Sequence, residues 1–297
     1  MRQLAFALTA TSIAGVIACG SGSTTTTPDP LAKVPKFIYV SGQSGGDQLY
    51  TYSAGQSTLF PGSVSGDADP QSAHGVVVFT SYRDAPNNSE IYSEKIDGSN
   101  IVRLTNNPAL DFKPSLKPDG TTIAFASLRS GTSRIWMMNA DGTNPTAIAT
   151  GSDQYTPETA PRFSPDGTQL LFNSPRSGTS QLWIMPAAGG TAVQLTHELN
   201  GAFDGSWSAD GASVFYVSGL DHADVHQIVV SSGAVANYVT GGTDVSQPAC
   251  NADVCLVVSG AGSSAGDILA YVGTGSTSPV PVVHSAANER QPAILHP

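Results

Sequence analysis

The stretch Pro161-Arg-Phe-Ser-Pro-Asp-Gly-Thr-Gln-Leu-Leu-Phe-Asn-Ser-Pro-Arg-Ser-Gly-Thr-Ser-Gln-Leu-Trp-Ile-Met-Pro186 is one unit of an internal repeat, and most of the remaining chain repeats it with substitutions. The same pattern begins upstream at Pro114, and the positions that coincide there are Asp119, Gly120, Phe125, Ser127, Arg129, Ser130, Gly131, Thr132, Ser133 and Trp136. Self-similarity at a period of roughly 20 to 50 residues indicates a solenoid, a propeller or another array of repeated modules. The number of units and the way the array ends therefore decide the architecture.

Each unit predicts four short strands separated by turns. Apolar and polar residues alternate within the segments, and Asp-Gly or Gly-Gly pairs supply the positive φ that tight hairpins need. In the unit quoted above, the predicted strands are residues 162–164, 169–173, 181–185 and 192–196. Segments equivalent to the second strand occur six times, at residues 37–40, 76–80, 122–126, 169–173, 213–217 and 255–258. We therefore predict six four-stranded modules.

The first strand of a module is missing before Phe37 and is present at the other end of the chain. The residues that mark this strand in the second to sixth modules are Pro70, Pro114, Pro161, Gly205 and Pro248. The segment Gln291-Pro292-Ala293-Ile294-Leu295 repeats the earlier Gln247-Pro248-Ala249. Pairing this segment with the first module would remove the open edge that a linear array exposes. The sequence therefore predicts an all-β, six-bladed β-propeller of four-stranded antiparallel blades, closed by the C-terminal strand in the first blade.

The composition favours a single acidic domain. Of the 297 residues, 12% are charged, and the formal net charge is -10. Nucleic-acid phosphates demand a basic face, so we expect no nucleic-acid partner. All-β folds of more than about 200 residues commonly form one unit, which predicts one propeller domain over residues 36–297.

Residues 1–19 resemble a bacterial lipoprotein signal. Arg2 precedes an apolar run at residues 4–18, and Val16-Ile17-Ala18-Cys19-Gly20 resembles a lipobox. Such a run is too short to span a bilayer in the mature protein and is normally removed. The resemblance implies a signal peptide at residues 1–18, cleavage before Cys19 and lipidation of Cys19. An ordinary signal peptide that happens to end near this cysteine is the alternative.

The segment after the lipobox is predicted to be a tether. Residues 19–35 are rich in Gly, Ser, Thr and Pro and lack the apolar content to pack. Gly20 follows the cysteine where an aspartate would favour inner-membrane retention, so the resemblance implies the outer membrane. We expect a lipid-anchored protein of the bacterial cell envelope, facing the periplasm or the exterior, with no other membrane contact.

One carboxylate precedes the first strand of each module. The six acids are Asp67, Asp111, Glu158, Asp204, Asp244 and Glu289. If the loops bring them to the mouth of a central channel, their mutual repulsion favours a bound cation, and calcium, which takes oxygen ligands, is the one we expect. Neutralising such acids would cost the fold little. The alternative is that each acid accepts hydrogen bonds from turn amides or faces water.

The cysteines, histidines, Gly-x-Ser-x-Gly segments and aromatic residues are candidates for structural or functional roles. Cys250 and Cys255 are expected to pair as a disulfide in an oxidising compartment. His222 and His226 have the spacing of a helical metal site but fall in a loop, and two Gly-x-Ser-x-Gly segments, at residues 42–46 and 262–266, lie in hairpin loops rather than on a strand-to-helix elbow. Aromatic residues at one repeat position are expected in the core, namely Tyr50, Tyr92, Trp136 and Trp183. Trp207 fits either the core or the channel wall.

The repeat resembles that of the TolB-type β-propellers, also called WD40-like or PD40 repeats. The resemblance rests on Ser164-Pro165-Asp166-Gly167, the strand ending at Ser174, the pair Leu182-Trp183 and the pair Leu195-Thr196. It implies six blades around a central channel. TolB proteins carry an additional N-terminal domain, whereas a tether is expected here, so we do not carry over the specific role of TolB.

Two functions stay open at this point. The first is a non-catalytic binding or scaffold module for an envelope protein or polymer, which fits the lack of a recognisable catalytic motif. The second is a polysaccharide-active or other metal-assisted enzyme that uses acids at the channel. The binding module is the favoured interpretation, and it requires no cofactor.

Overall fold

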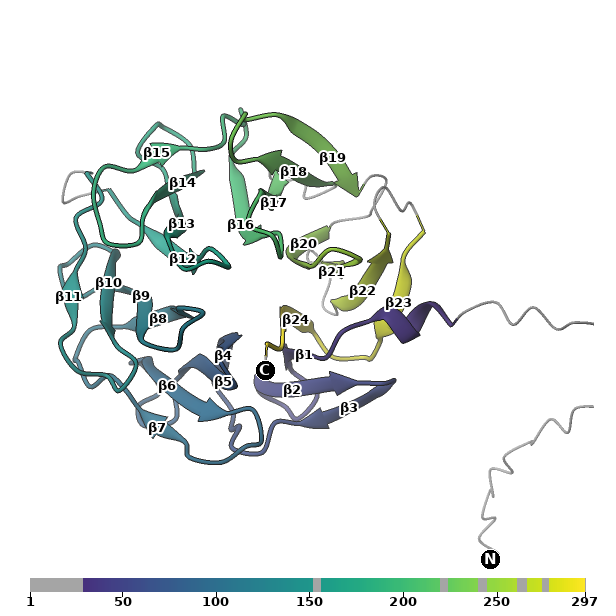
Figure 1. The fold of residues 1–297 in the computed structure, drawn as a ribbon. Coiled ribbons are helices and arrows are strands. Elements are labelled where there is room, and N and C mark those ends of the chain that lie inside the picture. The colour runs from purple at the N-terminus through teal and green to yellow at the C-terminus, as the bar shows by residue number, and fades with distance from the viewer. Residues whose placement is uncertain are drawn as a thin grey trace, which may run out of the picture.

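Six four-stranded antiparallel sheets surround a central axis in the computed structural model, which describes residues 29–151, 156–219, 224–239, 245–260, 266–273 and 278–296 (Figure 1). The first blade contains β24 (Glu289–Ile294), β1 (Phe37–Ser41), β2 (Gln48–Ser53) and β3 (Gln56–Leu59). The second contains β4 (Asp67–Ala73), β5 (Val76–Ser81), β6 (Glu90–Lys95) and β7 (Val102–Arg103). The third contains β8 (Asp111–Leu116), β9 (Thr122–Ser127), β10 (Arg134–Asn139) and β11 (Thr146–Ala147).

The second half of the chain repeats this order. The fourth blade contains β12 (Thr159–Phe163), β13 (Gln169–Ser174), β14 (Gln181–Pro186) and β15 (Val193–Gln194). The fifth contains β16 (Ala202–Trp207), β17 (Ser213–Ser218), β18 (Val225–Val229) and β19 (Val235–Val239). The sixth contains β20 (Val245–Cys250), β21 (Val254–Ser259), β22 (Asp267–Val272) and β23 (Val280–Val283). The predicted six-bladed propeller is confirmed.

The C-terminal strand closes the ring. β24 pairs antiparallel with β1, so that Phe37 lies opposite Ile294 and Ser41 lies opposite Glu289. In Figure 1 the yellow end of the chain lies beside the purple start of the propeller, in one sheet. The closure predicted from the missing first strand is confirmed.

The core lies between neighbouring blades. One apolar cluster joins Ile38 and Val40 of the first blade to Val77 and Phe79 of the second, and each of the four side chains is fully buried. In each blade, the second strand is buried on both faces, because a neighbouring sheet packs against each face. This explains why these segments are continuous apolar runs rather than alternating ones.

Asp-Gly turns connect the first and second strands of three consecutive blades. In the fourth blade Asp166 accepts a hydrogen bond from the Thr168 backbone N–H at 3.0 Å, and Gly167 has a φ of 69°. In the sixth blade Asn251 takes over the role of the aspartate, accepting from the backbone N–H of Asp253 and Val254. The described part of the chain contains one short 3-10 helix, η1 (Pro30–Lys33). No helix in that part is long and apolar enough to cross a membrane.

Candidate functional site

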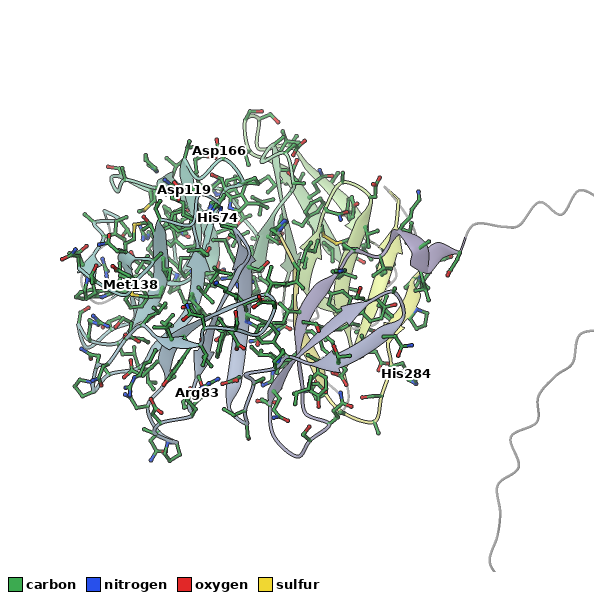
Figure 2. The ribbon with its side chains drawn as sticks, turned by 60° about the horizontal axis from the view of Figure 1, so that its bottom comes forward. His74, Arg83, Asp119, Met138, Asp166 and His284 are labelled. Carbon is green, nitrogen blue, oxygen red and sulfur yellow. A yellow bond between two sulfur atoms is a disulfide. The ribbon has the colours of Figure 1, made fainter. Side chains whose placement is uncertain are left out.

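The inner strands of all six blades line a cavity of about 490 Å³ on the propeller axis. Its opening lies at the end of the molecule where the first and second strands of the second to sixth blades are connected, beside His74 and Pro165. Figure 2 shows His74, Asp119 and Asp166 at this end and Arg83 and His284 at the opposite end. We call this opening the channel mouth.

Six residues in equivalent positions form a ring inside the cavity, which we call the channel ring. Each sits where the pairing of the first and second strands shifts register, and each has a φ between 51° and 54°. Residues other than glycine adopt this left-handed conformation uncommonly, and a β-bulge is a setting in which they do. The members of the channel ring are Asp69, Lys113, Ala160, Asp204, Gln247 and Gln291.

Side chains of the channel ring bind the backbone of the next blade. Asp204 accepts a hydrogen bond from the Gln247 N–H at 3.2 Å, and the Gln247 side-chain oxygen accepts one from the Gln291 N–H at 2.6 Å. The Gln291 side chain in turn accepts from the Asp69 N–H at 2.8 Å and donates to the Asp69 carboxylate at 2.6 Å. These bonds satisfy amides that the bulges remove from the sheet ladder, and they link the fifth, sixth, first and second blades.

Arg162 lies two residues beyond the ring position Ala160 and also lines the cavity. Burial lowers the pKa of its guanidinium from the usual 12.5, while the charges of Asp69 and Asp204 act in the opposite direction. Because Asp69 belongs to the second blade and Asp204 to the fifth, a fourth-blade side chain that interacts with both reaches toward the axis. The sequence analysis missed Arg162. The residue before the marker proline of an inner strand belongs to the channel ring, and this recurring position was the available signal for the neighbouring positions, Arg162 among them.

The sequence grouped Asp204 with the other five acids although it lies one residue before its marker position Gly205 rather than three or four, and the structure separates it from them. Asp204 belongs to the channel ring, directly before Gly205, and is equivalent to Asp69. The position that matches Asp67 is held in the fifth blade by Ala202, the first residue of β16. Asp244 lies outside the described residues.

Asp67, Asp111 and Glu158 are fully buried at the start of the inner strands, away from the cavity lining. Each pairs with an arginine that follows the second strand of its own blade. The ion-pair distances are 2.9 Å for Arg83–Asp67, 2.5 Å for Arg129–Asp111 and 2.6 Å for Arg176–Glu158. An arginine neutralises each of these three acids, so mutual repulsion among them does not favour a bound cation.

The same three arginines pack over aromatic rings. The guanidinium of Arg129 lies 4.6 Å from the ring centroid of Trp136 and 5.4 Å from that of Phe125. Its Nε donates to Ser127 Oγ at 2.9 Å, and Ser127 donates to Asp111 at 2.6 Å. The equivalent stacks are Arg83 on Phe79 and Tyr92, and Arg176 on Phe172 and Trp183. Of the predicted core aromatics, Tyr92 is buried, whereas Trp136, Trp183 and Tyr50 are partly buried against the core clusters. The first three also support an arginine.

Glu289 in the first blade has the same position but different partners. Its Oε1 accepts hydrogen bonds from Ser41 at 3.2 Å and Ser285 at 2.6 Å, and its Oε2 is buried without a partner among the described residues. Gln43 stands where the second, third and fourth blades have arginine, since its N–H donates to Ser41 Oγ just as the Arg83 N–H donates to Ser81 Oγ. The blade that closes the ring therefore lacks the buried ion pair.

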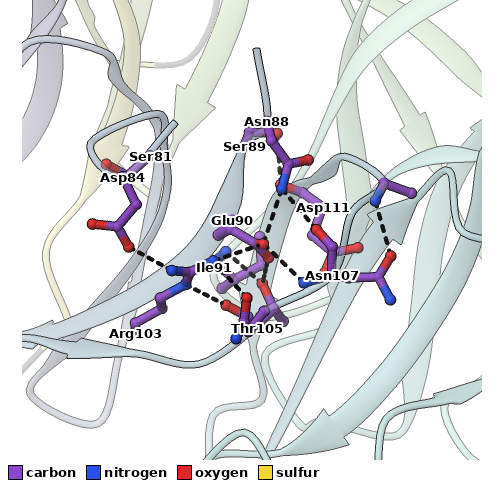
Figure 3. Close-up of polar contacts among 12 residues, drawn as sticks. Ser81, Asp84, Asn88, Ser89, Glu90, Ile91, Arg103, Thr105, Asn107 and Asp111 are labelled. Atoms are coloured by element: carbon purple, nitrogen blue, oxygen red, sulfur yellow. Dashed lines mark hydrogen bonds and ion pairs between the residues drawn. The ribbon is translucent and has the colours of Figure 1, made fainter. Parts of the chain in front are cut away.

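A second polar network in the second blade is centred on Glu90 (Figure 3). Its buried carboxylate accepts hydrogen bonds from Arg103 at 2.9 Å and from Thr105 Oγ1 at 2.6 Å. The Asn107 N–H donates to it at 2.9 Å, and Arg103 also pairs with Asp84 at 2.7 Å. The partners come from β7, from the segment that follows it and from the loop before β6, so the network fixes the strand ends rather than presenting a free acid.

The cysteines and the remaining motifs occupy structural positions. Cys250 and Cys255 lie opposite each other in the β20–β21 pair and are joined by a disulfide. His226 stacks on Tyr216 with ring centroids 5.4 Å apart, whereas His222 lies outside the described residues. Trp207 is 8% exposed, packs in the core between blades four and five, and also lines the cavity.

Calcium in the channel stays a prediction. Of the five predicted acids that the structure describes, Asp204 is the one that lines the cavity. Within the described ranges, no three Asp, Glu, His or Cys side chains are grouped in a way that could hold a metal ion. The donor set in the channel, with two carboxylates and the cations Arg162 and Lys113, does not resemble the oxygen cage that calcium prefers.

A second cavity, of about 650 Å³, forms an apolar groove between the outer strands of blades four and five. Val193 on β15 and Val235 on β19 line it and are 69% and 51% exposed. Both strands lie at the rim of the propeller in Figure 1. We call this surface the rim groove.

Comparison with known proteins finds similarity to TolB-type β-propellers. Residues 152–294 match the family model described as TolB beta propeller domain. A protein TolB homolog from Chlorobaculum tepidum is 37% identical over 76 residues, which cover 26% of this chain and 15% of that protein. The Tol-Pal system protein TolB of Bordetella pertussis is 44% identical over 45 residues, covering 15% of this chain and 10% of that protein. The chain thus aligns with well under two thirds of these relatives' length.

Solved structures agree on the architecture. TolB from Acinetobacter baumannii superposes with a TM-score of 0.74 at 19% identity, covering 89% of this chain and 67% of that one. A chain of a nidogen/laminin complex superposes with a TM-score of 0.65 at 10% identity, covering 87% of this chain and 97% of that one. At these identities the likeness shows the fold alone.

Proposed function

We propose that this chain, which carries a TolB-type β-propeller, is a non-catalytic protein-binding module of the bacterial cell envelope. The observation that carries the proposal is the propeller itself, because the relatives that share its repeat are named as TolB and as Tol-Pal system proteins. The ion pairs of the buried acids agree with a non-catalytic role. Asp67, Asp111 and Glu158 are held by arginines inside the blades, where they support the fold.

The partner is proposed to bind at the channel mouth. Binding sites are preferentially concave, and the mouth opens into the cavity that all six blades line. His74 and His296 belong to its lining, whereas His284 lies at the opposite end (Figure 2). The rim groove with Val193 is the competing surface.

Photo-crosslinking in intact cells tests this assignment. A photoreactive amino acid replaces His74 at the mouth, His284 at the opposite end or Val193 in the rim groove, and adducts are identified by mass spectrometry. We expect a single envelope protein to be captured from position 74 and not from position 284. A glycan adduct, capture from position 193 alone, or equal capture from all three positions would contradict the proposal.

The membrane attachment belongs to the same proposal. We propose that Cys19 is lipidated and holds the protein at the outer membrane through the tether of residues 19–35, on the strength of the lipobox Val16-Ile17-Ala18-Cys19. Cys19 lies outside the described residues. The Cys19→Ser variant is expected to leave the membrane fraction and to lose fatty-acid labelling, because hydrophobic burial of the acyl chains is the proposed attachment. A Cys19→Ser protein that is still labelled would show that the lipid is attached elsewhere, and an unlabelled wild type would refute lipidation.

A further inference from the structure

Arg162 is the single cationic side chain in its layer of the cavity. The layer lies between the channel ring and the mouth, two residues beyond the ring position in each inner strand. The other five members are short or neutral, namely Gln71, Ser115, Ser206, Ala249 and Ala293. The guanidinium therefore projects into space that the neighbouring blades leave open.

The guanidinium has unused donors. Its Nη1 donates to the carbonyl oxygen of Pro161 at 3.0 Å, and within the described part of the chain it forms no ion pair. Arginine carries five N–H donors in a planar fork that fits a carboxylate with two parallel hydrogen bonds. The indole of Trp207 donates to the Arg162 carbonyl oxygen at 3.1 Å and fixes the backbone of this residue. The fork is thus presented by a strand that is held in place.

An acceptor lies on the neighbouring blade. Asp204 uses its Oδ2 to accept from the Gln247 N–H at 3.2 Å, and its Oδ1 has no hydrogen-bond partner among the described residues. Asp69 differs, because both of its oxygens are occupied, by Thr80 and by Gln291. Asp204 can therefore accept from a cationic group in the cavity while Arg162 donates to an anionic one.

The carboxylates outside the cavity favour a ligand that carries a positive charge as well as a negative one. Asp119, Asp166 and Asp210 occupy exposed turns between the first and second strands, and Asp119 pairs with Lys117. Hydrogen bonds from neighbouring side chains and turn amides lower the pKa of all three carboxyls, so they stay ionised. A purely anionic molecule is repelled there, whereas a molecule that also carries an ammonium group is not.

We propose that the channel binds a small zwitterion, an amino-carboxylic acid whose carboxylate is held by Arg162 and whose ammonium group is held by Asp204. The cavity volume of about 490 Å³ lies in the range of small-molecule sites. The proposal does not rest on the protein-binding role proposed above, although the cavity lies behind the mouth to which that partner is assigned.

Isothermal titration calorimetry with simple probes tests the proposal. Glycine, 4-aminobutyrate and 6-aminohexanoate carry both charges at increasing separation, and butyrate and butylamine carry one charge each. The best of the three zwitterions is expected to bind at least about tenfold more tightly than either single-charge probe, because a second charge-assisted hydrogen bond is added. The preferred chain length then measures the separation of the two protein groups. No detectable binding of any zwitterion at millimolar concentration would overturn the proposal.

Variants assign the two ends of the probe. Arg162→Gln is expected to weaken the zwitterion and butyrate by about tenfold or more and to leave butylamine unchanged, and Asp204→Asn is expected to show the reverse selectivity. Lys117→Gln removes a positive charge that is paired with Asp119 at the mouth, and it serves as the matched control. Melting curves without probe establish that each variant is folded, and Arg162→Lys, which keeps the charge without the fork, replaces Arg162→Gln if that protein is unfolded. Unchanged zwitterion affinity in a folded Arg162 variant would show that the arginine only balances the charges of Asp69 and Asp204.

Discussion

Deletion of residues 290–297 is expected to abolish stable folding of the isolated protein. The deletion removes nearly all of β24 and leaves β1 with an unpaired edge in the first blade. It also uncovers Ile38 and Val40, which are fully buried against the second blade together with Ala293. The lost pairing and burial are comparable with the total stability of a domain, about 5–15 kcal/mol, and an open edge promotes aggregation. Circular dichroism and size-exclusion chromatography of the truncated protein measure both effects.

A synthetic peptide separates loss of closure from general damage. Residues 287–297 added in trans are expected to restore a cooperative melting transition, because the peptide can pair with β1 in the register seen in the ring. A peptide in which Ile294 is replaced by Asp is the matched control and is expected to fail. Unchanged melting of the truncated protein without any peptide would mean that β24 does not contribute to stability.

Replacing Asp111 with Asn is expected to destabilise the protein by about 3–5 kcal/mol, the usual result of breaking a buried ion pair on one side. Burial raises the pKa of Asp111, and its bonds to Ser127 and Arg129 oppose that rise. Asn keeps the shape but leaves the Arg129 side chain, which is 13% exposed, without its carboxylate. At about 2–4 °C for each kcal/mol in a domain of this size, the melting temperature falls by roughly 10 °C.

Two further variants check the cause of this loss. Asp119→Asn changes a carboxylate that is 47% exposed, and it is expected to move the melting temperature little. The double variant Asp111→Asn with Arg129→Gln is expected to lose much less than the two single variants together, because neither charge is then left alone. Additive losses would show that the two residues act independently. An unchanged melting temperature of the Asp111→Asn protein would show that the buried ion pair does not contribute to stability.

The sequence was sufficient for the fold because each local signal repeats. Asp166-Gly167 fixes a turn, the run at residues 169–173 fixes a doubly buried strand, and the same pair recurs in other blades. The absence of a proline-marked strand before Phe37 and its presence at Pro292 were enough to predict closure. Repetition averages out the errors that affect any single segment.

The site was harder to predict because spacing in a strand does not show where a side chain points. Asp67 precedes the marker residue Pro70 and Asp204 precedes the marker residue Gly205. The β-bulge in each of these two strands nevertheless places Asp67 inside its blade and Asp204 in the channel. The partners of the buried acids lie 16 or 18 residues away in sequence, just after the next strand of the sheet. Ser-x-Arg after the second strand, at residues 81–83, 127–129 and 174–176, was the available signal. Counting acids without their cations gave the wrong electrostatic picture.

The register of β1 against β24 also fixes the end of the propeller at which the chain enters, which bears on the lipid attachment proposed above. Phe37 lies opposite Ile294, and His296 beyond it lines the channel mouth, so the chain enters the propeller at the mouth end. The part of the proposed tether before η1, residues 19–29, can extend no more than about 40 Å. With Cys19 in the lipid, the mouth is held within a thin layer above the bilayer surface. A partner that lies in or on the same membrane is then sampled in two dimensions at a raised local concentration, whereas a partner farther away than the tether's reach is not met at all.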